Sequence, residues 1–212
     1  MNKILQEITA VNPDNPLEYC RKIIAPFAID KLNSIIDTCT HCKTASYCHK
    51  LGSGNPDANI LIITDNATNN DDVYDYLNSL LEQAEIDIND VYTMNAVSCI
   101  NTRGHGDNTI VRAPSYEELN NCKLYVDHAI DVIRPRVIIL MGASSLNMFT
   151  KAIFNNEISN WIKVKDIPAM VTYSPQDIYS FMEYMTDEEL NDKATVLLKD
   201  LITVNKYIQD NK

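Results

Sequence analysis

The chain has 212 residues, of which 29 are acidic and 18 are basic, so its formal net charge is −11. A hydrophobic content of 45% supplies one ordinary core and excludes wholesale disorder. No apolar run approaches the ~20 residues that span a bilayer, and the acidic balance argues against a generic nucleic-acid binder with a basic footprint.

The six cysteines are better read as reduced thiols or metal ligands than as a disulfide framework. The first residues include no apolar segment of the kind that a secretory signal needs. We therefore expect a cytoplasmic protein with no membrane partner. The abundance of Asn, Ile and Lys hints at an AT-rich bacterial or phage genome.

Hydrophobic spacing predicts helices and strands that alternate along the chain. The expected helices cover 14–38 (interrupted at Pro26), 72–86, 115–133 (opened by a capping box of Ser115 and Glu118), 143–154 and 186–208. The expected strands cover 58–63, 91–97, 136–141 and 167–173, and polar loops cover 39–57 and 100–114.

This alternation predicts an α/β fold, a three-layer α/β/α sandwich around a mainly parallel four-stranded sheet. We expect an N-terminal helical segment over 1–38, an α/β domain over 39–185, and a C-terminal helix over 186–212 packed on the same domain. Functional residues in such sheets follow the carboxyl ends of the strands. The segments to inspect are 64–71, 95–103, 142–145 and 173–176.

Four cysteines are candidate metal ligands. Cys39 and Cys42 form a C-x-x-C pair in a loop, which suits a tetrahedral metal or an iron–sulfur cluster, with a redox dithiol as the rival. Cys99 ends the second strand and Cys122 lies in the following helix, so both could converge on the same site. Cys20 and Cys48 remain as unassigned thiols.

With these segments in place, the chain resembles the family 4 uracil-DNA glycosylases, the iron–sulfur branch of that superfamily. The resemblance runs in unbroken order over about 39–176. The matching pieces are Cys39-x-x-Cys42, the stretch 52–58 leading into the first strand, 90–99 with Asn95 and Cys99, Arg103, 112–114, Glu118, Cys122 and 133–143.

The resemblance implies a [4Fe–4S] cluster on Cys39, Cys42, Cys99 and Cys122, with zinc as the alternative metal. It also implies base flipping and cleavage of the N-glycosidic bond as the chemistry. The spacing from Cys99 to Cys122 is longer than is usual in that family, and an insertion around 104–109 would explain it.

Members of the family share four sequence features that recognise uracil or assist its cleavage, and this chain keeps one of them. Asn95 matches the asparagine that reads the uracil edge. Asp65 replaces a glutamate, the loop with the stacking aromatic is missing so that only Tyr74 is nearby, and Ser174 replaces a histidine that stabilises the departing anion. Losing one such stabiliser costs about 3 kcal/mol of barrier.

The resemblance therefore assigns catalytic roles to Asp65, Asn95 and Ser174. Residues 64–90 carry eight acidic and no basic side chains, which repels a phosphate backbone. The candidate contacts to DNA or substrate are Asn66, Asn95, Arg103, His105 and Arg112, with a solvated surface loop as the alternative for the inserted segment.

Three functions stay open. The favoured one is a divergent, catalytically weak uracil-DNA glycosylase-like iron–sulfur protein that binds DNA, uracil-containing or single-stranded, or a replication or repair partner. The second is an active uracil-DNA glycosylase. The third is a metal-stabilised protein-interaction domain without a role on nucleic acid. The lost loop and Ser174 count against activity, whereas Asn95 and the cysteines count against the third.

Overall fold

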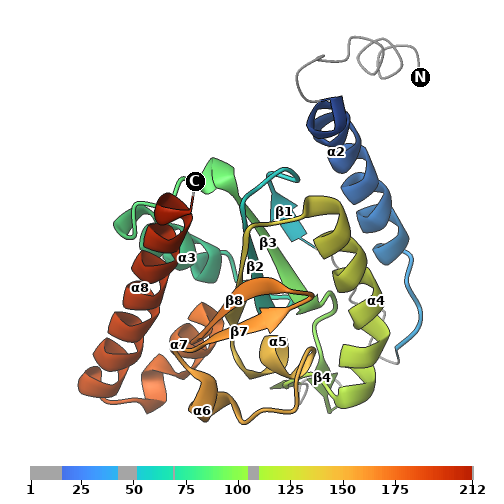
Figure 1. Ribbon diagram of the computed structural model, residues 1–212. Coiled ribbons are helices and arrows are strands. Elements are labelled where there is room, and N and C mark those ends of the chain that lie inside the picture. The colour runs from blue at the N-terminus through green and yellow to red at the C-terminus, as the bar shows by residue number, and fades with distance from the viewer. Residues whose placement is uncertain (1–15, 43–51, 69, 105–109, 212) are drawn as a thin grey trace.

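Figure 1 presents the computed structural model of the chain, which describes residues 16–42, 52–68, 70–104 and 110–211. A single six-stranded sheet forms its centre, in the order β1-β3-β2-β6-β8-β7. The four inner strands are parallel, as expected. The expected number of strands is wrong, because an antiparallel strand extends each edge of the sheet.

The parallel strands come from continuous apolar runs, which suit strands that are covered on both faces. They are β2 (Ile60–Asn66), β3 (Val91–Val97), β6 (Val137–Met141) and β8 (Ile167–Thr172). In register, Ile60 of β2 pairs with Val91 of β3 and with Val137 of β6. The strands therefore end together, and their carboxyl ends define one edge of the sheet.

The two edge strands are β1 (Gly52–Gly54) and β7 (Trp161–Val164). β1 contains only glycine and serine, and most of β7 is exposed or half-buried. Neither segment has the apolar run that marks the inner strands, so sequence patterning does not reveal them.

Helices cover both faces of the sheet, which gives the expected three layers (Figure 1). Helices α2 (Pro16–Ile36) and α4 (Tyr116–Ile133) pack on one face, in a core cluster that includes Ile29, Val126 and Ile130. Helices α3 (Asp71–Gln83), α7 (Pro175–Phe181) and α8 (Asp187–Asp210) cover the other face, where Leu77 and Leu201 belong to a second cluster.

The helical expectations need two corrections. Helix α2 continues through Pro26, because Ala25, Ile29 and Leu32 are buried and α2 packs on α4. The expected helix over 143–154 splits into α5 (Ala143–Asn147) and α6 (Phe154–Glu157). Thr150 accepts a hydrogen bond from the backbone N–H of Ala152 at 3.1 Å, which favours a turn between them.

Short elements fill the remaining segments. The polar loop over 100–114 contains a small hairpin of β4 (Thr102–Arg103) and β5 (Ile110–Val111). Two short 3₁₀ helices, η2 (Ile88–Asp90) and η4 (Met182–Tyr184), are also present among the described residues. Among the described residues, no helix is both long enough and apolar enough to cross a membrane.

Candidate functional site

The carboxyl ends of β2, β3 and β8 bring Asn66, Asn95 and Ser174 around one small cleft. Asn66 ends β2, Asn95 lies near the end of β3, and Ser174 follows β8. All three side chains are buried. The cleft has a volume of only about 10 Å³ and is closed on the helix side by Tyr74 and Leu77 of α3. That volume holds about one water molecule and no base.

Asp65 does not belong to this cleft. Successive side chains of a strand point to opposite faces, so Asp65 faces away from Thr64 and Asn66. Its Oδ1 accepts hydrogen bonds from the backbone N–H groups of Ser144 and Ser145, at 2.7 and 3.0 Å. Asp65 therefore caps the turn that leads from β6 into α5.

The cap is fitted tightly around Gly142. This glycine has a φ of +97°, and a Cβ at its position would lie 2.2–2.6 Å from the carboxyl group of Asp65. Burial, with a further contribution from the charge of Asp177, raises the pKa of Asp65 to about 7, although the Ser145 and Ser144 hydrogen bonds act in the opposite direction. A structural duty thus accounts for this carboxyl group.

The Asn95 amide is already engaged inside the protein. Its Oδ1 accepts a hydrogen bond from the hydroxyl of Thr64 at 2.8 Å. Its side chain also hydrogen-bonds the phenol of Tyr74, whose pKa is raised chiefly by burial. Thr64 and Tyr74 therefore fix the orientation of the amide, and Thr64 is a site residue that the sequence alone does not single out.

The buried hydroxyl group of Ser174 makes no hydrogen bond to the described residues. The side chain is 1% exposed, and its Oγ has no hydrogen-bond partner among the described residues. It precedes α7 at the N-cap position, yet makes no side-chain capping bond there. The hydroxyl faces the closed cleft and can donate one hydrogen bond to a group placed in it.

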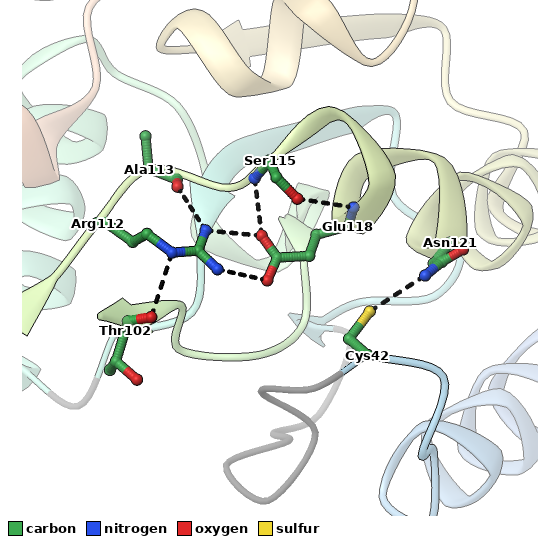
Figure 2. Close-up of polar contacts among 7 residues, drawn as sticks. All are labelled: Cys42, Thr102, Arg112, Ala113, Ser115, Glu118 and Asn121. Carbon is green, nitrogen blue, oxygen red and sulfur yellow. Dashed lines mark hydrogen bonds and ion pairs between the residues drawn. The ribbon is translucent and has the colours of Figure 1, made fainter. Parts of the chain in front are cut away.

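The cysteine pair after α2 lies against α4. The Nδ2 of Asn121 donates to the Sγ of Cys42 at 3.4 Å, and the hydroxyl of Tyr125 donates to the Sγ of Cys39 at 3.8 Å. Figure 2 shows the first of these contacts. Asn121 and Tyr125 are four residues apart on α4 and therefore share one helix face that also borders Cys122.

The other two cysteines are buried in the core. Cys99, just after β3, and Cys122, in α4, are buried in the core cluster that α2 also joins. None of these four described cysteines is in a disulfide. Cys39 and Cys42 thus contact α4, the helix that also carries Cys122, and the gathering of all four thiols around one metal stays a prediction.

The surroundings of these thiols bear on whether they fit a metal centre. Asn101, two residues after Cys99, is fully buried, and neither polar atom of its amide has a hydrogen-bond partner among the described residues. Sulfur atoms of a cluster would accept such a hydrogen bond. In the described part of the chain, however, no group of three or more Cys, His, Asp or Glu side chains is arranged so that it could hold a metal ion. The donor chemistry fits, and the cofactor stays a prediction.

Arg112 lies in a structural ion pair (Figure 2). Its two terminal nitrogens each lie 2.7 Å from an oxygen of Glu118, and it also donates to the carbonyls of Thr102 and Ala113. Glu118 is 8% exposed and completes the capping box with Ser115. The guanidinium thus ties the β4–β5 hairpin to the start of α4, and its role on DNA stays a prediction.

The other expected contacts lie at the margin of the described structure. Arg103 is exposed on β4. His105 and Cys48 fall outside the described residues, and the structure does not describe the side chain of Cys20. The partners Asn121 and Tyr125 could have been found from their spacing around Cys122 on a predicted helix.

Comparison with known proteins assigns the family. No curated protein matches the chain. The family model of the uracil DNA glycosylase superfamily matches residues 51–194, which include the whole sheet and the closed cleft. Since this match covers more than half of the sequence, the chain belongs to the uracil DNA glycosylase superfamily.

Proposed function

We propose that this chain is a divergent, catalytically weak uracil-DNA glycosylase-like iron–sulfur protein that binds DNA or a replication or repair partner. The observation that carries the proposal is the closed cleft: Asn95 and Ser174 face it, but its volume of about 10 Å³ excludes a base. The carboxyl group that would assist cleavage, Asp65, caps α5 instead.

Cleavage needs several groups to act on one transition state. A base excluded from the cleft cannot meet both Asn95 and Ser174, and the hydroxyl of Ser174 cannot carry the positive charge that a histidine brings to a departing anion. Each loss of this kind costs about 3 kcal/mol of barrier, and the losses need not add. The binding function does not require these groups, so it can persist.

The first test is excision of uracil from single- and double-stranded DNA by the full chain purified without oxygen. We expect a rate at least about a hundredfold below that of a superfamily member with the full motif set, since about 2.7 kcal/mol corresponds to a hundredfold. Ser174→His alone should not restore the rate, because the cleft has no room for an imidazole ring. Rapid excision by the wild type, abolished both by Asn95→Ala and by Asp65→Ala, would establish an active enzyme instead.

The cofactor is tested separately. We expect a [4Fe–4S] cluster held by Cys39, Cys42, Cys99 and Cys122, which would join the ends of α2 and β3 to α4. Protein produced with iron should be brown, and its broad visible absorbance should vanish on Cys→Ala substitution at any of the four. Cys20→Ala and Cys48→Ala are the matched controls and should keep the colour. A colourless protein with one equivalent of zinc would contradict the assignment.

A further inference from the structure

An open groove of about 410 Å³, termed here the three-helix groove, lies where α3, α7 and α8 meet. Figure 1 shows these helices together on one side of the sheet. Tyr76 of α3, Ile178 and Tyr179 of α7, and Leu190 of α8 are among the residues that line it. In the described part of the chain it shares no lining residue with the closed cleft, so it is a separate surface feature.

The lining of the three-helix groove is mainly apolar. Ile178 is 5% exposed and belongs to the second core cluster, and Tyr76 and Leu190 pack against the same cluster. Met182 of η4 also lines the groove and is 46% exposed. Apolar side chains from three helices and η4 thus form one contiguous patch, which marks an interaction surface more than scattered single residues do.

Both long helices that flank the groove begin with acidic side chains. Asp71 and Asp72 lie in the first turn of α3, and Asp187, Glu188 and Glu189 lie in the first turn of α8. All five are exposed, and Asp187 itself lines the groove. The three-helix groove is therefore an apolar surface with a negative rim.

Two contacts keep this rim negative. The Oδ2 of Asp72 accepts a hydrogen bond from the hydroxyl of Tyr179 at 2.7 Å, so this carboxylate is held beside the groove. Lys193, the first basic residue of α8, places its Nζ 4.6 Å from the centroid of the Tyr173 ring. Among the described residues, neither Lys nor Arg lines the groove. A basic partner thus meets carboxylates there and no competing cation.

The charge of the rim decides between possible occupants. The phosphates of DNA and the headgroups of an anionic membrane would meet carboxylates without a counter-ion. A second copy of this chain carries the same net charge of −11 and would be repelled as a whole. A basic segment is attracted instead, and complementarity of this kind raises the rate and the specificity of association.

The walls of the groove favour a helix as the occupant. Their backbone groups bond within each helix, so an extended peptide would find no open sheet edge to pair with. An amphipathic helix needs no such edge, because it inserts the apolar side chains of one face into a hydrophobic groove. Basic residues beside that face would then lie against the first turns of α3 and α8.

We propose that the three-helix groove docks the apolar face of a basic amphipathic helix that belongs to a partner protein. The inference rests on the proposed function, to whose replication or repair partner it gives a surface and a chemistry. Tyr76, Met182 and Leu190 contact the apolar side chains of that helix, and Asp72 and Asp187 face its basic ones.

The test follows the fluorescence anisotropy of a labelled synthetic peptide as the full chain is added. The peptide has about 18 residues, or about five turns of helix, with leucines on one face and lysines on the other. We expect saturable binding of one peptide per chain that weakens with added salt. A peptide of the same composition but without an apolar face should bind at least about tenfold more weakly, and so should one with glutamate in place of lysine.

The groove variant combines Met182→Arg with Asn191→Arg and should weaken peptide binding at least about tenfold. Both residues line the groove and are exposed, so the two arginines fill it and add positive charge without entering the core. The matched control combines Leu124→Arg with Asn120→Arg, at exposed positions of α4 on the other face of the sheet. It changes the net charge equally and should bind within about twofold of the wild type.

Asp187→Asn tests the rim separately from the apolar lining. This variant should weaken peptide binding at low salt and match the wild type at high salt, where charges are screened. Circular dichroism of each variant verifies the fold. A loss of binding that is equally large at high salt would mean that the rim does not act through its charge, which contradicts the choice of a basic partner.

Four further outcomes would overturn the inference: no saturable binding, equal binding by the groove variant and its control, equal binding of the peptide without an apolar face, or a dimer of the wild type that only the groove variant dissociates. The last would assign the groove to a second copy. Failure of the proposed function is distinguishable, because rapid excision of uracil from DNA reveals it. Rapid excision together with groove-dependent peptide binding would refute only the catalytic weakness.

Discussion

Replacing Asp65 by Asn should stabilise the protein at pH 8 by about 4 kcal/mol. Folding raises the pKa of this buried carboxyl group from 3.8 to about 7, and a tenfold change in a proton-binding constant corresponds to about 1.4 kcal/mol. Above pH 7 the folded protein holds a buried anion at a cost that the unfolded chain avoids. An asparagine removes this cost while its Oδ1 still accepts from Ser144 and Ser145.

The sign of the pH dependence follows from proton binding. Between about pH 4 and pH 7 the folded state holds the proton of Asp65 and the unfolded state does not, so this residue lowers stability as the pH rises. Asp65→Asn should therefore resemble the wild type near pH 4 and exceed it progressively up to pH 7. Urea denaturation at several pH values measures the difference.

The matched control is Asp75→Asn, which changes an exposed carboxylate on α3 and should leave stability nearly unchanged. Parallel pH profiles of wild type and Asp65→Asn would mean that the two N–H groups at the start of α5 already hold Asp65 ionised. Relief of the repulsion on Asp177 is included in the expected gain, since the two charges interact.

The case of Asp65 shows what the sequence could and could not predict. The existence of β2 follows from its apolar run, and so does the placement of a polar group at its carboxyl end. A strand that is buried on both faces has no alternation of apolar and polar residues, so the face of each side chain cannot be read from the pattern. For this reason the pattern could not show that Asn66 lines the cleft while Asp65 caps α5.

The cysteine region was predictable in a different way. A C-x-x-C pair after one helix, a cysteine at the end of a strand and another in the next helix can be placed from local patterns, and the structure shows that the pair contacts α4, which carries Cys122. The closure of the cleft by Tyr74 was not predictable, because it depends on how α3 packs over β2 and β3. Tertiary packing decides the volume of a pocket, and no local pattern encodes it.

The role of Arg112 was ambiguous for a third reason. An arginine in a polar loop has the same local sequence whether it meets a phosphate or a carboxylate. The partner Glu118 is six residues away, and the pairing depends on the turn between β5 and α4 that Ser115 terminates. The capping box was predictable from Ser115 and Glu118 alone, but the ion pair was not.

Replacing Arg112 by Met should destabilise the protein by about 3 kcal/mol at pH 7. The substitution keeps much of the side-chain volume but leaves the buried carboxylate of Glu118 without its cation, which is costly in itself. It also removes the hydrogen bonds to the carbonyls of Thr102 and Ala113. Arg103→Met is the matched control, because Arg103 is exposed on the same hairpin and should contribute little.

A second substitution separates the ion pair from the helix cap. Glu118→Gln in the Arg112→Met background removes the unpaired charge and retains a side chain that can complete a capping box. The double variant should therefore recover part of the lost stability, and the four proteins form a double-mutant cycle with a coupling of about 1–3 kcal/mol. Additive effects of the two substitutions would mean that the pair contributes nothing beyond its separate members.

DNA binding at low salt distinguishes a role within the fold from a role on nucleic acid. If Arg112 acts only within the fold, then Arg103, which is exposed on β4, is the arginine that DNA would meet. Arg103→Glu should therefore weaken DNA binding. The paired Arg112 and Glu118 add no net charge to the surface that DNA would meet.

The free energy of unfolding at acidic pH gives an independent measurement of the Arg112–Glu118 ion pair. Hydrogen bonding to Arg112 leads the causes that lower the pKa of Glu118 from 4.5 to about 2. Its contribution is present above pH 4.5 and is lost as the pH falls toward 2, because the folded state then takes up a proton later than the unfolded state. The gap between wild type and Arg112→Met should accordingly narrow from pH 5 to pH 2. A gap that stays constant down to pH 2 would show that Arg112 supports the hairpin through its carbonyl contacts and not through the carboxylate.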